Sequence, residues 1–196
     1  MSADNAPGGL ALVQELVNTL DVESGRDVLA SPGDTAEFLE RHCLPRLPAG
    51  EITELARLRE ALRAVLLVHA GHLPTTAVPA RTGAGAANGS AADPTAELNR
   101  LLGAGPLLLR VGPGGAADLV PVDHLRGVSF VTARVAAAVA EGVREGSWRR
   151  LKACEATDCR WAYYDRSPAG RRRWCSMRVC GSRAKMRAYR ARRRDG

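Results

Sequence analysis

Residues 154–180 read CEATDCRWAYYDRSPAGRRRWCSMRVC and hold four of the five cysteines of the chain. Four residues separate Cys154 from Cys159, fifteen follow before Cys175, and four more precede Cys180. Two equal pairs of cysteines joined by a loop are typical of a tetrahedral zinc site, in which each pair forms a small knuckle. Because four thiolates fill the coordination shell, we expect one structural Zn²⁺ per chain rather than a catalytic metal.

Two other interpretations of these cysteines are open, namely four free thiols without a metal and a redox pair. The four-residue gaps differ from the two-residue gap that redox pairs usually have. The surrounding segment has little Leu or Val to bury, so metal binding would supply the folding free energy that it needs. Cys43 lies far away in the sequence beside apolar residues, and we expect it in the core or at the surface.

The segment after the third cysteine carries a resemblance to a known family. Residues 174–177 read WCSM and residues 180–185 read CGSRAK, and together they resemble the hallmark of the CGNR zinc finger family of bacterial transcription regulators. The family typically has Asn where this chain has Ser182. A serine keeps a small polar side chain, so we expect the turn to survive this departure.

A weaker likeness covers the preceding residues. Residues 10–146 look like the companion N-terminal domain of that family, called ABATE, through LVNTLD at residues 16–21 and through Leu98-Asn99. The resemblance implies a ligand-binding role for this domain. Asn18 and Asn99 either hydrogen-bond inside the helical core or line a ligand pocket, and the resemblance slightly favours the pocket.

Charge is distributed unevenly along the chain. Residues 1–143 hold 11 Lys and Arg against 16 Asp and Glu, whereas residues 144–196 hold 17 against five, a balance of +12. A strongly basic segment beside an acidic one indicates an anionic partner, most often nucleic acid. Because the basic residues are almost all Arg, their positions carry more information than their type.

A basic helix is predicted directly after the last cysteine, over residues 182–193. We expect Gly181 to free the backbone for a turn and Ser182 to cap the helix. Met186 and Tyr189 form an apolar edge that could pack on the knuckles. The residues predicted to contact nucleic acid are those of one helical face and its flank, and of the loop between the knuckles: Arg183, Lys185, Arg187, Arg190 and Arg194, with Arg171, Arg172 and Arg173. The alternative is a solvated helix, or one that docks on the acidic first domain.

Four aromatic residues are interleaved with these charges: Trp161, Tyr163, Tyr164 and Trp174. Exposed rings would stack on unpaired bases and favour single strands or RNA. The more conservative interpretation is that they form the miniature core of the finger, because small metal modules need apolar filling.

The predicted fold class is mainly α with a small β-hairpin (α+β), followed by a separate small zinc-binding finger that ends in a basic helix. Apolar spacing predicts helices over 10–20, from Asp34 to Pro45, and over 51–70, 95–102 and 123–145. Residues 106–111 and 118–122 read as a hairpin joined by GPGG. Residues 1–9 are expected to be disordered and 71–93 to form a loop, and the domains are 10–146 and 147–196.

Several function classes are disfavoured. No nucleophile–base pair or open metal site is visible, so we do not expect an enzyme. His69 and His72 near a helix end are read as solvated groups favoured by the helix dipole. No secretory signal or membrane-spanning run is present, which predicts a cytoplasmic protein without a membrane partner.

The resulting hypothesis is a one-component transcription regulator. The finger would bind DNA, and the first domain would sense a small-molecule effector. The alternatives are an RNA-binding protein and a module that binds an acidic protein. A homodimer is compatible with this hypothesis, although no heptad pattern indicates one.

Overall fold

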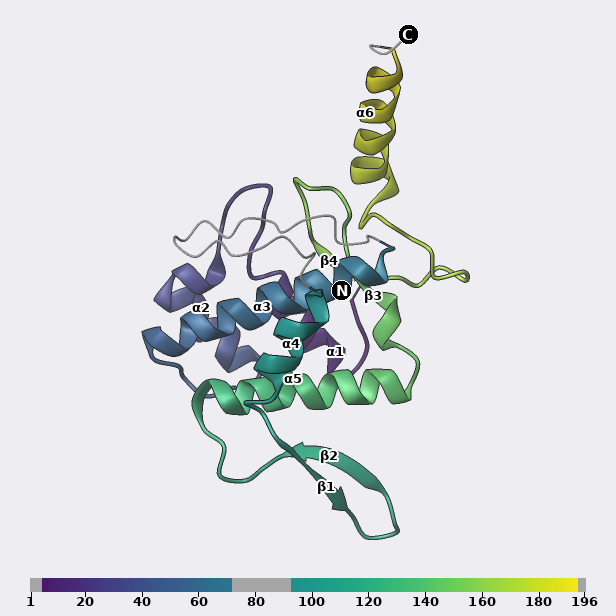
Figure 1. Cartoon of the computed structure of the whole chain (residues 1–196). Helices are drawn as coiled ribbons and strands as arrows, with labels where there is room; N and C mark the ends of the chain where they lie inside the picture. Colours follow the sequence, from purple (N-terminus) through teal and green to yellow (C-terminus); the bar gives the residue numbers. More distant parts are fainter. Residues whose placement is uncertain (1–4, 72–92, 194–196) are drawn as a thin grey trace.

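The computed structural model describes residues 5–71 and 93–193. Three helices form the centre of the first domain: α1 (Leu10–Val17), α3 (Ala49–His69) and α5 (Gly127–Arg144). Two further helices, α2 (Pro32–Arg41) and α4 (Pro94–Leu102), complete this helical body, together with the 3-10 turn η1 (Val28–Ala30). Figure 1 shows the helical body between a hairpin at one end and a projecting helix at the other.

The core of the helical body is built from the apolar faces that the helical periodicity predicts. Its fully buried side chains come from α1, α3 and α5: Leu10, Val13, Leu16, Val17, Leu55, Leu58, Leu62, Leu66, Val131 and Val135. Close approach of α1 to α5 needs a glycine. A Cβ on Gly142 would lie 2.9 Å from Leu10 Cδ1, which is shorter than a van der Waals contact.

Among the described α-helices, α2 and α4 begin with a capping side chain at the N-cap residue, whereas α1, α3 and α6 (Ser182–Arg192) have none. The helix predicted from Asp34 begins at Pro32, and its cap is Ser31, whose hydroxyl accepts from the Asp34 amide at 3.4 Å. Pro32 then occupies the first turn, where its missing N–H costs nothing. A carboxylate from α3 caps the start of α5: Glu51 Oε2 accepts a hydrogen bond from the Val128 amide at 2.8 Å.

Two antiparallel hairpins make up the strands that the structure describes. The predicted one consists of β1 (Leu107–Val111) and β2 (Ala117–Pro121), with Leu109 opposite Leu119. The second consists of β3 (Leu151–Ala153) and β4 (Ala162–Tyr164) and was not predicted. Each of its strands has only three residues, too few for an alternating pattern to be recognised.

The second hairpin joins the finger (residues 147–193) to the helical body. Leu151, Ala153, Ala162 and Tyr164 belong to the same apolar cluster as the helices of the body. A separate cluster lies inside the finger and contains the four cysteines with Ala156, Tyr163 and Trp174. The predicted fold class is therefore confirmed, and the finger has its own small core but shares one hairpin face with the body.

Two arginines of α3 lie inside the protein, although charged side chains are seldom buried without a partner. Arg59 and Arg63 are only 4% and 5% exposed. Arg59 makes a two-pronged ion pair with Asp27, with distances of 2.6 and 2.9 Å. Arg63 donates to the main-chain carbonyls of Val17 and Leu20. Both guanidiniums thereby fix the segment that follows α1.

The remaining predictions concern the ends and loops of the chain. Of the N-terminal residues expected to be disordered, residues 5–9 are described, and Ala6 is buried and donates its amide to Gln14 Oε1. The predicted loop over 71–93 lies almost wholly outside the described residues. Among the helices that the structure describes, none has the length and apolarity needed to cross a membrane.

Candidate metal centre and nucleic-acid interface

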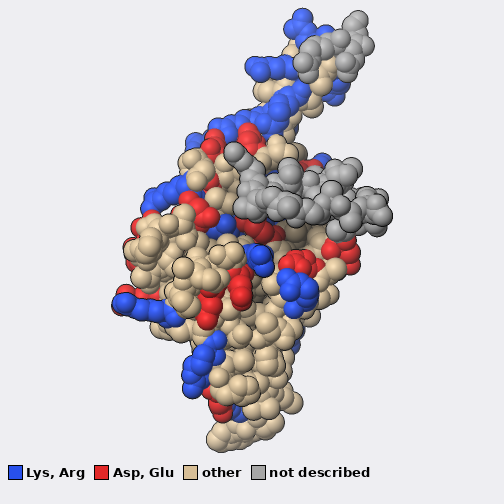
Figure 2. Space-filling view, turned by 60° about the vertical axis from the view of Figure 1, so that its left-hand side comes forward, with Lys and Arg blue, Asp and Glu red and all other residues tan. Residues whose placement is uncertain are grey.

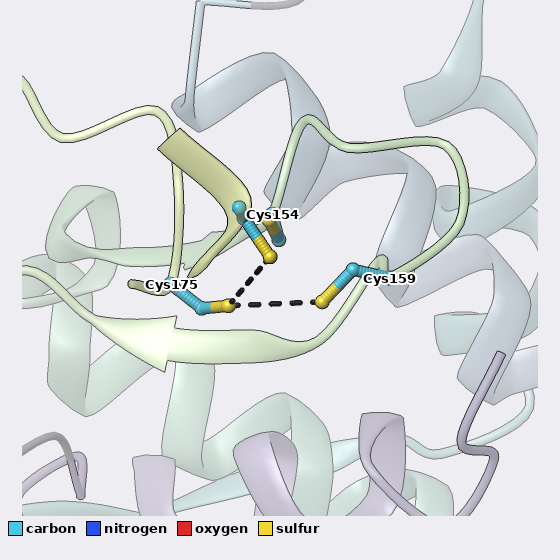
Figure 3. Close-up of side chains that lie close together, drawn as sticks. Cys154, Cys159 and Cys175 are labelled. Atoms are coloured by element: carbon cyan, nitrogen blue, oxygen red, sulfur yellow. Dashed lines mark hydrogen bonds between the residues drawn. The ribbon is translucent and has the colours of Figure 1, made fainter. Parts of the chain in front are cut away.

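The four predicted zinc ligands converge in the finger. The Sγ atoms of Cys154, Cys159, Cys175 and Cys180 all lie within 4.8 Å of one another. Cys175 Sγ is 3.6 Å from Cys159 Sγ and 3.7 Å from Cys180 Sγ. Figure 3 shows the side chains of Cys159 and Cys175 pointing toward each other from different segments. Sulfurs spaced in this way surround a point that a tetrahedral ion would occupy.

Local backbone structure places each cysteine pair. The first pair occupies the connection between β3 and β4, where the amides of Cys159 and Arg160 both donate to the Ala156 carbonyl. Arg160 accordingly takes a positive φ of 56°. The second pair spans the start of η3 (Met177–Gly181), a wide helical turn that leads into α6 (Ser182–Arg192). The first knuckle is thus a hairpin turn, and the second knuckle begins a helix.

The pKa values of the clustered thiols favour a bound cation between the four sulfurs. Hydrogen bonds from Cys159 and Cys175 lower the pKa of Cys154 to about 2, so one thiolate forms readily. The hydrogen bond with Cys154 raises the pKa of Cys159 to about 12, because a second negative charge beside the first is unfavourable. A divalent ion would relieve this repulsion, since it deprotonates the thiols that coordinate it. The four cysteines therefore fit one structural zinc, and a shell of four thiolates leaves no position for water.

A buried ion pair, which the sequence analysis missed, organises the loop between the knuckles. Lys152 Nζ lies 2.9 Å from Asp165 Oδ2, and these side chains are 4% and 0% exposed. The Asp165 carboxylate also accepts from Ser167 Oγ at 2.6 Å and from the Arg172 amide at 2.9 Å. Lys152 Nζ also donates to the carbonyls of Gly170 at 2.6 Å and Arg172 at 3.3 Å. Burial alone raises the pKa of Asp165, but these hydrogen bonds outweigh it and hold the pKa well below its usual value.

The three arginines predicted in this loop have different surroundings. Arg171 is exposed. Arg172 is half-buried, with its guanidinium 5.0 Å from the centre of the Tyr163 ring. Arg173 is exposed and pairs with Glu155. Arg171 therefore presents its charge to solvent, whereas Arg172 and Arg173 also stabilise the finger itself.

Helix α6 projects from the finger and carries four of the eight predicted nucleic-acid contacts. None of its residues is buried. Figure 2 shows blue side chains gathered on this projection. Among its predicted contact residues, Arg183, Lys185, Arg187 and Arg190 are exposed, and Arg194 lies outside the described residues.

One further arginine belongs to the same surface. Arg178 lines a shallow groove of about 500 Å³ together with Arg183, Arg187 and Arg190. We call these four residues the basic face. The sequence prediction assumed α-helical spacing and therefore missed Arg178. This residue lies in the wider turn η3, where α-helical spacing does not apply.

Three expectations about the start of α6 are wrong. Gly181 has helical angles, with φ −64° and ψ −41°, and makes no turn. Ser182 does not cap the helix, because η3 continues directly into α6; its hydroxyl instead donates to the Met177 carbonyl at 3.2 Å. Met186 and Tyr189 do not pack on the knuckles, since they are 51% and 50% exposed. The helix leaves the finger at an angle that keeps both in solvent.

The aromatic residues of the finger mainly serve its core. Tyr163 is 1% and Tyr164 8% exposed, and Trp174 is half-buried against the cysteines. Burial also raises the pKa of Tyr163. Trp161 is the exception, with 39% of its surface exposed. The miniature-core interpretation therefore describes Tyr163 and Trp174, whereas Tyr164 packs in the core of the helical body.

The two asparagines proposed for a pocket lie in different places. Asn18 faces β4, and its amide donates to the Ala162 carbonyl at 2.9 Å while its oxygen accepts from the Ala162 amide at 2.7 Å. Asn18 also lines a cavity of about 420 Å³ between α1 and the finger, together with Trp161 and Cys175. We call this cavity the interdomain groove. Asn99 is exposed on α4 and does not approach Asn18.

One of the two histidines at the end of α3 also connects the domains. His69 Nδ1 lies 2.9 Å from the Leu151 carbonyl, and its ring meets the Trp148 ring edge to face at 4.9 Å. Burial lowers the pKa of His69, which favours the neutral ring. The interpretation of His69 as a solvated group is therefore wrong, and His72 lies outside the described residues.

Comparison with known families agrees with this architecture. Residues 150–193 match the model of the CGNR zinc finger. Residues 10–146 match the ABATE model, described as "Putative stress-induced transcription regulator". No curated protein matches the chain. Because the ABATE match spans well over half of the sequence, the chain belongs to the ABATE family and carries a CGNR zinc finger after its ABATE domain.

Proposed function

We propose that the protein is a one-component transcription regulator that binds duplex DNA through the basic face of α6. The observation that carries this proposal is a projecting helix with exposed arginines and no buried residue. A helix that buries nothing in its own fold contributes little to stability, so its sequence serves an external contact. A helix of this kind fits the major groove of DNA, where arginines bind phosphates and the edges of guanine.

Carboxylates of the same chain form ion pairs with only some of the basic residues of α6. Arg183 pairs with Glu23 at 2.8 Å, and Arg187 with Asp158 at 3.5 Å. In the described part of the chain, no carboxylate lies within ion-pair distance of Lys185 or Arg190. Exposed ion pairs contribute little free energy, about 0 to 1 kcal/mol each, so phosphates can displace the two that exist.

The burial of the finger's aromatic residues favours duplex DNA over single-stranded RNA. Stacking on unpaired bases needs several exposed rings along a basic groove. Among the described rings of the finger, Trp161 is 39% exposed but lies at the interdomain groove, and Tyr189, 50% exposed, is the single ring on α6. Tyr163 and Tyr164 are buried and could not stack without unfolding the finger.

The interdomain groove suits a role in sensing. It lies where α1 meets the finger, and Asn18 and Trp161 give it both amide and aromatic surface. Small-molecule sites are concave and occur often at the junctions between domains. We therefore place the effector of the proposed regulator in this groove, where a ligand would contact both domains at once.

Fluorescence anisotropy tests the nucleic-acid class directly. The zinc-loaded chain is titrated into labelled duplex DNA and into single-stranded RNA of equal length at several salt concentrations. We expect tighter, strongly salt-dependent binding to the duplex. Preference for RNA that is lost in Trp161→Ala would favour an RNA-binding protein. Absence of binding to either nucleic acid at physiological salt would favour a protein partner.

A further inference from the structure

The four zinc ligands differ in their access to solvent. Cys154 is 0% and Cys180 3% exposed, whereas Cys159 and Cys175 are each half-buried. Cys175 also lines the interdomain groove, a cavity large enough to admit a small molecule. Reagents therefore reach the zinc site through Cys175, which lines the interdomain groove, while Cys159 is partly exposed.

The two accessible cysteines are also neighbours. Their sulfurs are 3.6 Å apart, and they come from different knuckles. Figure 3 shows that the two side chains point toward each other. A covalent bond between them would need only a small movement of either sulfur.

We propose that Cys159 and Cys175 form a reversible redox pair, which a peroxide oxidises to a disulfide with release of the zinc. The Cys175 thiolate attacks one oxygen of hydrogen peroxide; the O–O bond breaks, hydroxide leaves, and sulfur becomes a sulfenic acid. The Cys159 thiolate then attacks this sulfur, the S–S bond forms, the S–O bond breaks, and a second hydroxide leaves. Two electrons pass from the sulfurs to the peroxide, and both hydroxides take protons from solvent to become water.

Oxidation would detach α6 and leave the helical body folded. An ion deprived of two of its four ligands would leave, so Cys180, in the turn η3 from which α6 begins, would lose its link to the first knuckle; the disulfide holds only Cys175. Helix α6 has no buried residue that could hold it in place. The hairpin of β3 and β4, in contrast, stays in the core of the body through Leu151 and Ala162. This consequence rests on the proposed function, because it makes DNA binding sensitive to oxidants.

The test uses the zinc-loaded full chain with Cys43→Ser, since Cys43 is exposed and would react independently. Hydrogen peroxide is added, and released zinc is followed with a metallochromic indicator. Free thiols are then alkylated and the chain is digested with trypsin. Cleavage after Arg178 places Cys175 and Cys180 on different peptides, and fragmentation of the peptide that contains Cys154 and Cys159 distinguishes those two.

We expect about one zinc per chain to be released in step with a single disulfide between Cys159 and Cys175. Dithiothreitol with added zinc should restore the starting state. The proposal is overturned if the zinc stays bound, if the disulfide includes Cys154 or Cys180, or if only irreversible sulfinic acids form. These readouts do not involve DNA, so a reduced chain that fails to bind DNA would contradict the proposed function and leave the redox pair intact.

Discussion

The amide of Asn18, at the end of α1, pairs with both the N–H and the C=O of Ala162 in β4, although 144 positions separate the two residues. The side chain thereby makes the two hydrogen bonds that a neighbouring strand would make at the free edge of β4. The segment after Asn18 reaches the finger as well, because Glu23 pairs with Arg183 of α6. The ABATE domain is therefore linked to the finger and to α6 through residues 18–23.

Replacing Asn18 with Ala should lower the free energy of unfolding by about 1–3 kcal/mol, because it leaves the buried N–H of Ala162 without its partner. The Ala162 carbonyl keeps a second donor, Gln14 Nε2 at 3.2 Å. Chemical denaturation of the zinc-loaded chain measures this loss. Asn99→Ala is the matched control, since Asn99 is exposed, and should change stability by less than about 0.5 kcal/mol. Equal effects of the two substitutions would show that the pairing with Ala162 contributes nothing.

Lys152→Met should destabilise the chain by about 3–5 kcal/mol, because it leaves the Asp165 carboxylate buried without its cation. Lys185, the only other lysine, is exposed, so Lys185→Met is the control. The double variant Lys152→Met with Asp165→Asn should lose less than the sum of the two single variants. Strict additivity in the denaturation midpoints would argue against direct coupling.

Substituting Arg187 and Arg190 together with Ala should weaken binding to duplex DNA and reduce the salt dependence. Each lost phosphate contact lowers the slope of log K against log salt by about 0.9, so the slope should fall by about 2. A variant with Arg46→Ala and Arg57→Ala removes the same charge from exposed positions of the body and should change the slope much less. If the two double variants behaved alike, the basic face would not be the binding surface.

The buried ring of His69 predicts a dependence of stability on pH. Burial lowers its pKa, so below the unfolded value of about 6.5 the unfolded chain takes up a proton that the folded chain resists. This contribution to stability is thus complete above about pH 6.5 and is lost as the pH falls. His69→Gln retains a donor for the Leu151 carbonyl but does not titrate. Wild type should therefore lose stability relative to this variant between about pH 7.5 and about pH 5.5.

His124 is exposed and provides the control for this pH experiment. The variant His124→Gln should follow the wild type over the same pH range. Zinc binding is equally pH-dependent in all three proteins because the four thiolates are unchanged, so it cancels in the comparison. A difference between wild type and His69→Gln that does not vary with pH would contradict the prediction.

Features set by residues close in sequence could be predicted. The cysteine spacing gave the metal ligands because each knuckle is a local turn, and apolar periodicity gave the helices of the body. The hairpin of β1 and β2 was predicted from two apolar runs and a glycine-rich turn. Helix caps were less certain, because Ser31 and Asp34 are both good capping residues and only the backbone decides between them.

Features that depend on distant partners could not be predicted. Arg59 and Arg63 look like surface residues until Asp27 and the carbonyls after α1 are placed beside them. Lys152 and Asp165 are thirteen positions apart on short strands or loops, and no periodicity relates them. Asn18 could be singled out as a polar residue in an apolar segment, but its partner Ala162 carries no sequence signal.

The most direct test of the central claim is the affinity of one preparation for duplex DNA with zinc bound and after removal of zinc by a chelator. We expect about one zinc per chain, salt-sensitive binding of the loaded form, loss of binding after chelation, and recovery when zinc is restored. DNA binding that is unchanged after complete removal of zinc would contradict the account, because α6 would then not depend on the four cysteines for its position.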